Sequence, residues 1–134
     1  MYTVLVVDDC QFTRFMYVDA LSSAGFFVVE AENGFIGLNL AQKVAFDIVL
    51  TDQNMPHMDG TTLTRELRNL FHYINTPILV LTSESSDEFK MDIGLAGATG
   101  WLEKPVNSER LIAVMNLAIS KHQKVMRRTE NYYQ

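Results

Sequence analysis

The chain has 134 residues, a net charge of −5 and 48% hydrophobic residues, which fits one well-packed domain and excludes a disordered chain. The acidic balance argues against a nucleic-acid-binding protein, because such proteins need a dense positive surface. The single cysteine, Cys10, permits no internal disulfide and favours a reducing cytoplasm, and the sequence has no apolar run of membrane-spanning length.

Basic residues are concentrated at the C-terminal end. Residues 121–134 contain four of them and one glutamate, a sum of +3, so residues 1–120 carry −8. The basic residues are Lys121, Lys124, Arg127 and Arg128. Because no nucleic-acid-binding motif accompanies them, we predict the end of a solvated last helix followed by a basic tail.

The first half of the chain alternates between strand-length apolar runs and segments of helical period. Tyr2–Val7 is predicted as a strand, and 12–24 as a helix that a glycine terminates. Phe26–Ala31 is predicted as a second strand, ended by an Asn33-Gly34 turn. Apolar residues between 36 and 44 then indicate a second helix.

The same alternation continues in the second half. The predicted strands are Phe46–Thr51, Pro77–Leu81 and a weaker Ala98–Leu102. Helices are predicted over Thr61–Phe71 and 84–95, and a last one from an N-cap at Asn107.

Five strand–helix repeats predict an α/β fold. The first, third and fourth strands lack in/out alternation, which is expected when helices cover both faces of a parallel sheet. Right-handed crossovers then give a three-layer, doubly wound, five-stranded parallel sheet with five helices. In such folds ligands bind at the carboxyl ends of the strands.

Acidic residues stand where two predicted strands end. Asp8 and Asp9 follow the first strand, and Asp52 follows the third. One acid alone is explained equally well as a helix cap. Three acids at two strand ends are different, because packed like charges cost stability unless a cation offsets them. We interpret them as ligands of a divalent cation, and Mg²⁺ suits carboxylate oxygens combined with water and phosphate.

The loop after Asp52 adds features that suit phosphoryl transfer. Asn54 can offer a backbone carbonyl to the metal, while Pro56 and Gly60 favour a tight turn. A carboxylate such as Asp52 can accept a phosphoryl group as an aspartyl phosphate. A metal ion bridging the two would neutralise charge during the transfer.

Two more residues complete the predicted edge. The Thr82 hydroxyl, at the end of the fourth strand, can hydrogen-bond a phosphoryl oxygen, although strand propensity alone also explains a threonine there. Lys104 can supply a positive charge to another oxygen. Pro105 directly after it indicates a fixed, cis peptide at the strand end.

Together these residues resemble the response-regulator receiver domain of two-component signalling, whose fold is CheY-like and flavodoxin-like. The segments that carry the resemblance are Val6-Val7-Asp8-Asp9, 51–60, Leu81-Thr82-Ser83 and Lys104-Pro105. Each segment is weak alone, but the combination is specific. It implies a receiver domain over residues 2–120, with 121–134 as the end of the last helix and a basic tail.

The resemblance implies a role for each acidic position. Asp52 would accept a phosphoryl group from the phosphohistidine of a histidine kinase. Asp9, Asp52 and the Asn54 carbonyl would hold Mg²⁺, with Asp8 acting largely through bound water.

It also implies how phosphorylation is sensed. Thr82 and Lys104 would bind the phosphoryl oxygens. Trp101, three residues before Lys104, would occupy the aromatic switch position, where the side chain moves inward after the hydroxyl. Tryptophan is less usual there than tyrosine or phenylalanine, and an ordinary half-buried strand aromatic is the alternative interpretation.

The resemblance implies a cytoplasmic, single-domain switch that catalyses only its own phosphoryl transfer and dephosphorylation. Its partners would be a sensor histidine kinase or phosphotransfer protein and a downstream target protein. A chemotaxis-type output, such as a flagellar switch, would use the face formed by the fourth helix, the fifth strand and the fifth helix. Neither a nucleic acid nor a membrane is expected as a partner.

Other functions were weighed against the same residues. A haloacid-dehalogenase-type phosphatase requires Asp-x-Asp after the first strand, which Asp8-Asp9-Cys10 does not supply. A flavodoxin-like cofactor protein requires a phosphate-cradling loop, and residues 10–13 contain no glycine. A receiver used only for docking would lack part of the acidic set. A phosphorelay intermediate, or a receiver cut from a larger regulator or hybrid kinase, stays open.

Overall fold

The computed structural model describes the backbone of residues 1–133 and the side chains of residues 1–128. Five parallel strands form one sheet in the order β2-β1-β3-β4-β5. The strands are β1 (Thr3–Val7), β2 (Phe27–Ala31), β3 (Ile48–Asp52), β4 (Ile78–Thr82) and β5 (Gly100–Glu103). The helices are α1 (Gln11–Ser23), α2 (Gly34–Lys43), α3 (Gly60–Arg68), the 3₁₀ turn η1 (Phe71–Tyr73), α4 (Asp87–Ala96) and α5 (Ser108–Tyr133).

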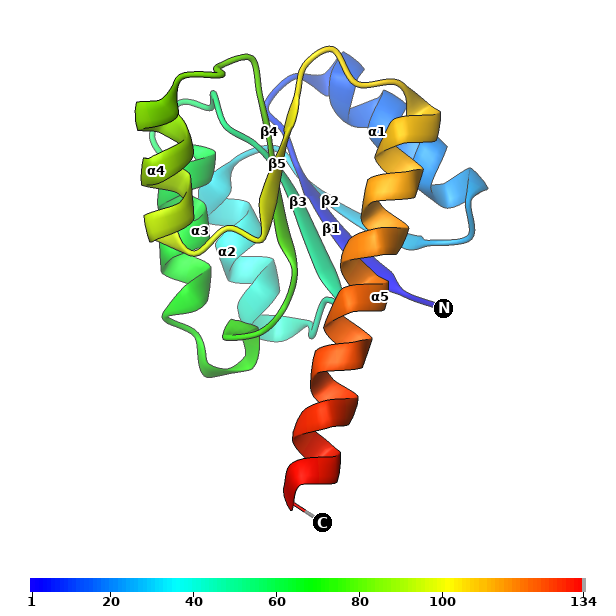
Figure 1. The fold of residues 1–134 in the computed structure, drawn as a ribbon. Helices are drawn as coiled ribbons and strands as arrows, with labels where there is room; N and C mark the ends of the chain where they lie inside the picture. Colours follow the sequence, from blue (N-terminus) through cyan, green and yellow to red (C-terminus); the bar gives the residue numbers. More distant parts are fainter. Residues whose placement is uncertain (134) are drawn as a thin grey trace.

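The sheet is the middle of three layers. Helices α1 and α5 cover one face, and α2, α3 and α4 cover the other (Figure 1). Along β1, Val4 and Val6 join the core under α1 and α5, whereas Leu5 and Val7 join the core under α2 and α3. Alternate residues of one strand therefore enter two apolar cores, which explains its unbroken apolar run. The predicted doubly wound α/β fold is confirmed.

Most of the predicted local features at the ends of helices and strands are present. Gly25 has φ of +96° after α1, where a left-handed backbone ends the helix. The Asn107 side chain accepts the N–H of Arg110 at 2.8 Å and so caps α5. The peptide between Lys104 and Pro105 is cis, as predicted.

Several predicted boundaries were wrong by up to three residues. Asn33 is an N-cap rather than part of a free turn, since its side chain accepts the Ile36 N–H at 2.8 Å, and α2 therefore begins at Gly34. The helix predicted from 84 begins at Asp87, because Ser86 caps it. The helix predicted over Thr61–Phe71 ends at Arg68, and η1 follows.

The last helix is much longer than the other helices. It has 26 residues and projects beyond the three-layer body (Figure 1). The segment 121–134, predicted as the end of the last helix and a basic tail, is helical through Tyr133. Gln134 and the side chains of 129–133 lie outside the described residues. None of the helices in the described part of the chain combines the length and apolarity of a membrane span.

Candidate functional site

The carboxyl ends of β1 and β3 lie side by side and bring three acids together. The ladder pairs Val7 with Thr51, so the acids that follow each strand meet at one edge. Oxygen atoms of Asp8, Asp9 and Asp52 lie within 4.8 Å of one another. The winding direction of the chain reverses between these two strands, which is where doubly wound folds bind ligands.

The two acids after β1 differ in environment. Asp8 is 1% exposed, and its carboxylate accepts the Cys10 N–H at 2.9 Å and the Thr13 hydroxyl at 2.6 Å. These bonds tie Asp8 to the start of α1, but the N-cap residue of that helix is Cys10, so Asp8 is not its cap. Asp9 is exposed and lies at the open side of the cluster. One carboxylate is held in place while the other faces solvent.

Asp52 is a buried acid whose charge is only partly compensated. Its side chain contacts the Lys104 ammonium, and the two side chains are 5% and 28% exposed. Burial raises the pKa of Asp52, and the nearby carboxylates of Asp8 and Asp9 raise it further, which outweighs the opposing effect of Lys104. Burial alone would lower the pKa of Lys104, but its contact with Asp52 outweighs that effect and raises it.

The loop from β3 to α3 folds back tightly on the strand end. A Cβ atom at Gly60 would lie 2.5 Å from the Asp52 carbonyl oxygen, so only glycine allows this approach. The Gln53 side chain accepts the Thr61 N–H at 2.9 Å, and Asp59 caps α3. Asn54 lies exposed in this loop, two residues after the acceptor candidate.

Thr82 and Trp101 lie on neighbouring strands but in different surroundings. Thr82 is fully buried at the end of β4, and its hydroxyl accepts the Glu84 N–H at 2.9 Å. Trp101 is 41% exposed on β5, with the Lys90 ammonium 5.7 Å from its ring centre. The aromatic side chain is therefore at the surface, held against α4 by a cation–π contact.

Several residues that shape the site were not predicted. Thr13 and Gln53, described above, are two of them. Arg14 is a third, and it donates to the Asp8 carbonyl at 2.7 Å and to the Glu30 carboxylate at 2.8 Å. It thereby fixes the end of β1. Thr13 lies one turn into the helix after Asp8, a spacing that could have revealed its contact, whereas the partners of Arg14 become neighbours only in the folded sheet.

The acidic cluster fits a hard divalent cation. Three carboxylates converge, two of them buried, and Lys104 is the one cation paired with any of them among the described residues. Such an excess of negative charge is costly without a counter-ion, and oxygen ligands of this kind suit Mg²⁺.

A sequence model for the response regulator receiver domain matches residues 4–116. The chain belongs to this family. Among solved structures, chemotaxis response regulator CheY4 of Vibrio cholerae is 42% identical, with a TM-score of 0.86, over 88% of this chain and 98% of that one. The receiver domain of sensor histidine kinase PA1611 from Pseudomonas aeruginosa, with magnesium in its active-site cleft, is 25% identical, with a TM-score of 0.82, over 89% and 98%.

Curated relatives include both short and long proteins. Protein PilH of Pseudomonas aeruginosa is 31% identical over 90% of this chain and 99% of its own length. Sensor histidine kinase RcsC of Salmonella typhi is 38% identical over 81% of this chain, but the match spans only 11% of that kinase. The predicted family and fold are confirmed, and receiver domains act as signalling switches rather than as conventional enzymes.

Proposed function

We propose that the chain is a phosphorylation-controlled switch whose phosphoryl acceptor is Asp52. The observation that carries the proposal is the surroundings of this one side chain. Asp52 is buried, contacts Lys104, and lies within 4.8 Å of two further carboxylates at the switch point of the sheet. A nucleophile, a cation and a set of metal ligands therefore share one edge.

The proposed reaction is a displacement at phosphorus. A carboxylate oxygen of Asp52 attacks the phosphorus of a phosphohistidine, and the P–N bond breaks. Its electron pair stays on the imidazole nitrogen, which takes a proton from solvent. Hydrolysis by water later restores the carboxylate and releases phosphate.

Asp9, Asp52 and the Asn54 carbonyl would hold Mg²⁺, with Asp8 acting through bound water. The bound ion supplies charge neutralisation between carboxylate and phosphoryl oxygens. A magnesium ion in the cleft of the PA1611 receiver supports this choice of metal. The hydrogen bonds from Cys10 and Thr13 keep the Asp8 carboxylate oriented without the ion.

Lys104 and Thr82 would bind the phosphoryl oxygens after transfer. Because its pKa is raised, Lys104 stays protonated and remains a cation for the product. The Thr82 hydroxyl now accepts the Glu84 N–H and would turn toward the phosphoryl group to donate. The adjoining β4–α4 loop would shift with it.

Trp101 would report this shift at the surface. Its ring starts 41% exposed beside Lys90, and it would move inward behind Thr82. The face formed by α4, β5 and α5 would thereby change its shape and bind a target protein. Similarity to the chemotaxis protein CheY4 favours a chemotaxis-type output. We place the switch in the cytoplasm, downstream of a sensor histidine kinase or phosphotransfer protein.

A second candidate is a receiver that passes the phosphoryl group onward. The match to RcsC, a sensor histidine kinase, favours a phosphorelay intermediate or the receiver segment of a larger kinase. Transfer from the phosphorylated chain to a histidine phosphotransfer protein would distinguish relay from output.

Phosphorylation is tested with a small phosphodonor such as acetyl phosphate, with intact-protein mass as the readout. We expect a mass gain of one phosphoryl group that requires Mg²⁺ and disappears in Asp52→Ala. Asp92→Ala, which changes an exposed acid on α4, is the matched control and should label normally. An unlabelled wild-type protein, or a labelled Asp52→Ala variant, would refute the proposal.

A further inference from the structure

A surface groove lies at the opposite end of the sheet from the acidic site. It occupies about 440 Å³ between the start of β3, the segment from Phe71 to Thr76, and α5, where His122 and Met126 line it. Two adjoining hollows, of about 380 and 210 Å³, share His122 with it. The amino-terminal edge of the sheet and the outer half of α5 therefore enclose a concave surface.

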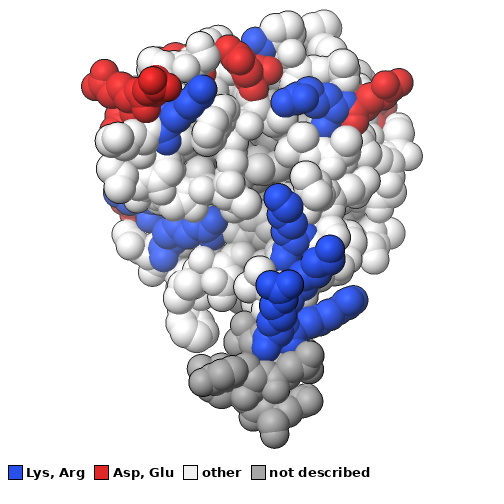
Figure 2. All heavy atoms as spheres, in the orientation of Figure 1, with Lys and Arg blue, Asp and Glu red and all other residues white. Residues whose placement is uncertain are grey.

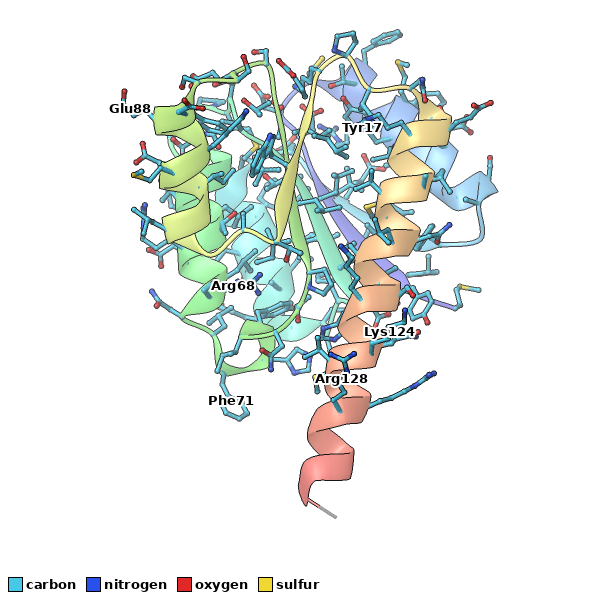
Figure 3. The ribbon with its side chains drawn as sticks, in the orientation of Figure 1. Tyr17, Arg68, Phe71, Glu88, Lys124 and Arg128 are labelled. Carbon is cyan, nitrogen blue, oxygen red and sulfur yellow. The ribbon has the colours of Figure 1, made fainter. Side chains whose placement is uncertain are left out.

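The groove has exposed apolar side chains on both walls. Phe71 is 90% exposed, Ile74 54% and Met126 37%. Figure 3 shows the Phe71 ring pointing away from the body at the end from which α5 projects. Isolated exposed apolar residues need no explanation, but a cluster around a hollow marks an interaction site.

Of the four cations on the outer half of α5, two line the hollows beside the groove. Lys121, Lys124, Arg127 and Arg128 are all exposed, and they gather on the outer half of α5 (Figure 2). Arg127 lines the second hollow and Lys121 the third. Within the described part of the chain none of the four forms an ion pair. Asp47 is the acid that lines the hollows, and its carboxylate accepts the Thr3 N–H at 2.7 Å.

We propose that this groove, termed the basal groove, docks an acidic amphipathic segment of a partner protein. An apolar side chain of the partner would insert between Phe71 and Met126, while its carboxylates would pair with the cations of α5. Concavity favours a protein segment over a flat membrane surface, because a hollow can hold a side chain. The −8 charge of residues 1–120 opposes nucleic acid.

The basal groove is separate from the switch. Its cations lie beyond residue 116, where the family match ends, and its other walls lie at the amino-terminal ends of the strands. Docking there would leave the Asp52 edge open. We therefore expect binding that does not depend on phosphorylation and that anchors the receiver near a partner.

The test uses the full chain and a displayed library of short random peptides. Peptides that bind the bare support are removed first, and the remainder are selected on the wild-type protein. We expect enriched sequences with an aromatic or aliphatic residue beside several Asp or Glu residues. Absence of enrichment, or enrichment of basic sequences, would overturn the proposal.

Matched variants locate the binding of one selected, fluorescently labelled peptide. Phe71→Ser and the pair Lys121→Glu with Arg127→Glu should each weaken binding about tenfold or more, as central contacts do. Phe35→Ser, which changes another exposed aromatic, and the pair Arg110→Glu with Arg65→Glu are controls that should bind within about twofold of wild type. Equal losses of peptide affinity in test and control variants would show that the peptide does not bind in the basal groove.

Charge exchange and competition complete the test. A peptide with its acids replaced by Lys should bind the Lys121→Glu/Arg127→Glu protein better than it binds wild type. Vesicles with and without phosphatidylserine, duplex DNA and excess unlabelled protein are added as competitors. Displacement by anionic vesicles or DNA would assign the surface to those ligands instead, and displacement by the chain itself would assign it to self-association.

Discussion

The two ends of the sheet differ in the sign and the burial of their charged side chains. At the carboxyl edge, two buried acids, Asp8 and Asp52, lie close to the exposed Asp9, and Lys104 is paired with Asp52. At the amino-terminal edge, four cations of α5 are spread over an exposed surface beside apolar side chains. Charge that is buried and concentrated suits a small ion and a phosphoryl group, whereas charge that is exposed and spread out suits a protein surface.

Buried charges and exposed charges also differ in their effect on the free energy of folding. Burial raises the pKa of Asp52, so its charge opposes folding unless a ligand offsets it. Exposed lysines and arginines lose little hydration and can be replaced with small effect. The following predictions test that division, from the largest expected effect to the smallest.

Arg68 tests whether burial rather than charge decides the effect of a cation. Its guanidinium donates to the carbonyls of Tyr73, Thr76 and Gly97 and has no acidic partner in the described part of the chain (Figure 3). Arg68→Met should lower the free energy of unfolding by about 3 kcal/mol, because three carbonyls lose a charged donor. Urea denaturation measures this effect. The exposed Arg65→Met on the same helix is the control and should change stability by less than about 0.5 kcal/mol. Equal losses of stability in the two variants would contradict the claim that burial decides the effect.

Mg²⁺ should stabilise the acidic edge. At about 100 times its Kd, the ion should raise the free energy of unfolding of the wild-type chain by about 2.7 kcal/mol, by preferential binding to the folded state. Thermal unfolding with and without Mg²⁺, at matched ionic strength, measures the effect. Asp52→Asn should respond much less. A response of equal size in that variant would show that the ion binds elsewhere.

Without metal, Asp52→Asn should stabilise the fold at neutral pH by about 1 kcal/mol, because an amide removes a buried charge next to Asp8 and Asp9. The sign follows from the raised pKa of Asp52. The folded state binds that proton more tightly than the unfolded state, so wild-type stability falls as pH rises from the ordinary Asp range through the raised pKa. Chemical denaturation between acidic and neutral pH should show the gain at neutral pH and its loss in acid. A variant less stable than wild type at neutral pH would refute this prediction.

Reversing charges on the outer half of α5 should have little effect on stability. Lys121→Glu with Arg127→Glu should change the free energy of unfolding by less than about 0.5 kcal/mol and leave Asp52 labelling unchanged, because both side chains are exposed. Thermal unfolding and intact mass measure the two effects. A large loss of stability would mean that these cations support the fold instead of a partner.

How much the sequence could predict follows the same division. The strand-end acids, Thr82 and Lys104 were predictable because apolar strands have clear ends and parallel strands bring those ends to one edge. The structural role of Arg68 was not predictable, because a basic residue in an amphipathic helix gives the same sequence pattern whether it faces solvent or loop carbonyls. Its partners are as far away in sequence as Gly97.

The basal groove escaped sequence reasoning for a related reason. The composition of residues 121–134 predicts a solvated helix end, and the four cations are indeed exposed. One wall of the hollow beside them is the segment where η1 replaces the last turn of a predicted helix, and there Phe71 points outward (Figure 3). Such a surface depends on how a turn packs, which no local pattern records.

The central claim is that Asp52 is the acceptor, and chemical marking of the acyl phosphate tests it most directly. The chain is treated with acetyl phosphate and Mg²⁺, reduced with borohydride, and sequenced by tandem mass spectrometry. Reduction of an aspartyl phosphate leaves homoserine at the labelled position. We predict homoserine at position 52 and only in samples that received both donor and Mg²⁺. Homoserine at position 8 or 9 instead, or an unmodified Asp52 in a protein that gained a phosphoryl group, would contradict the account.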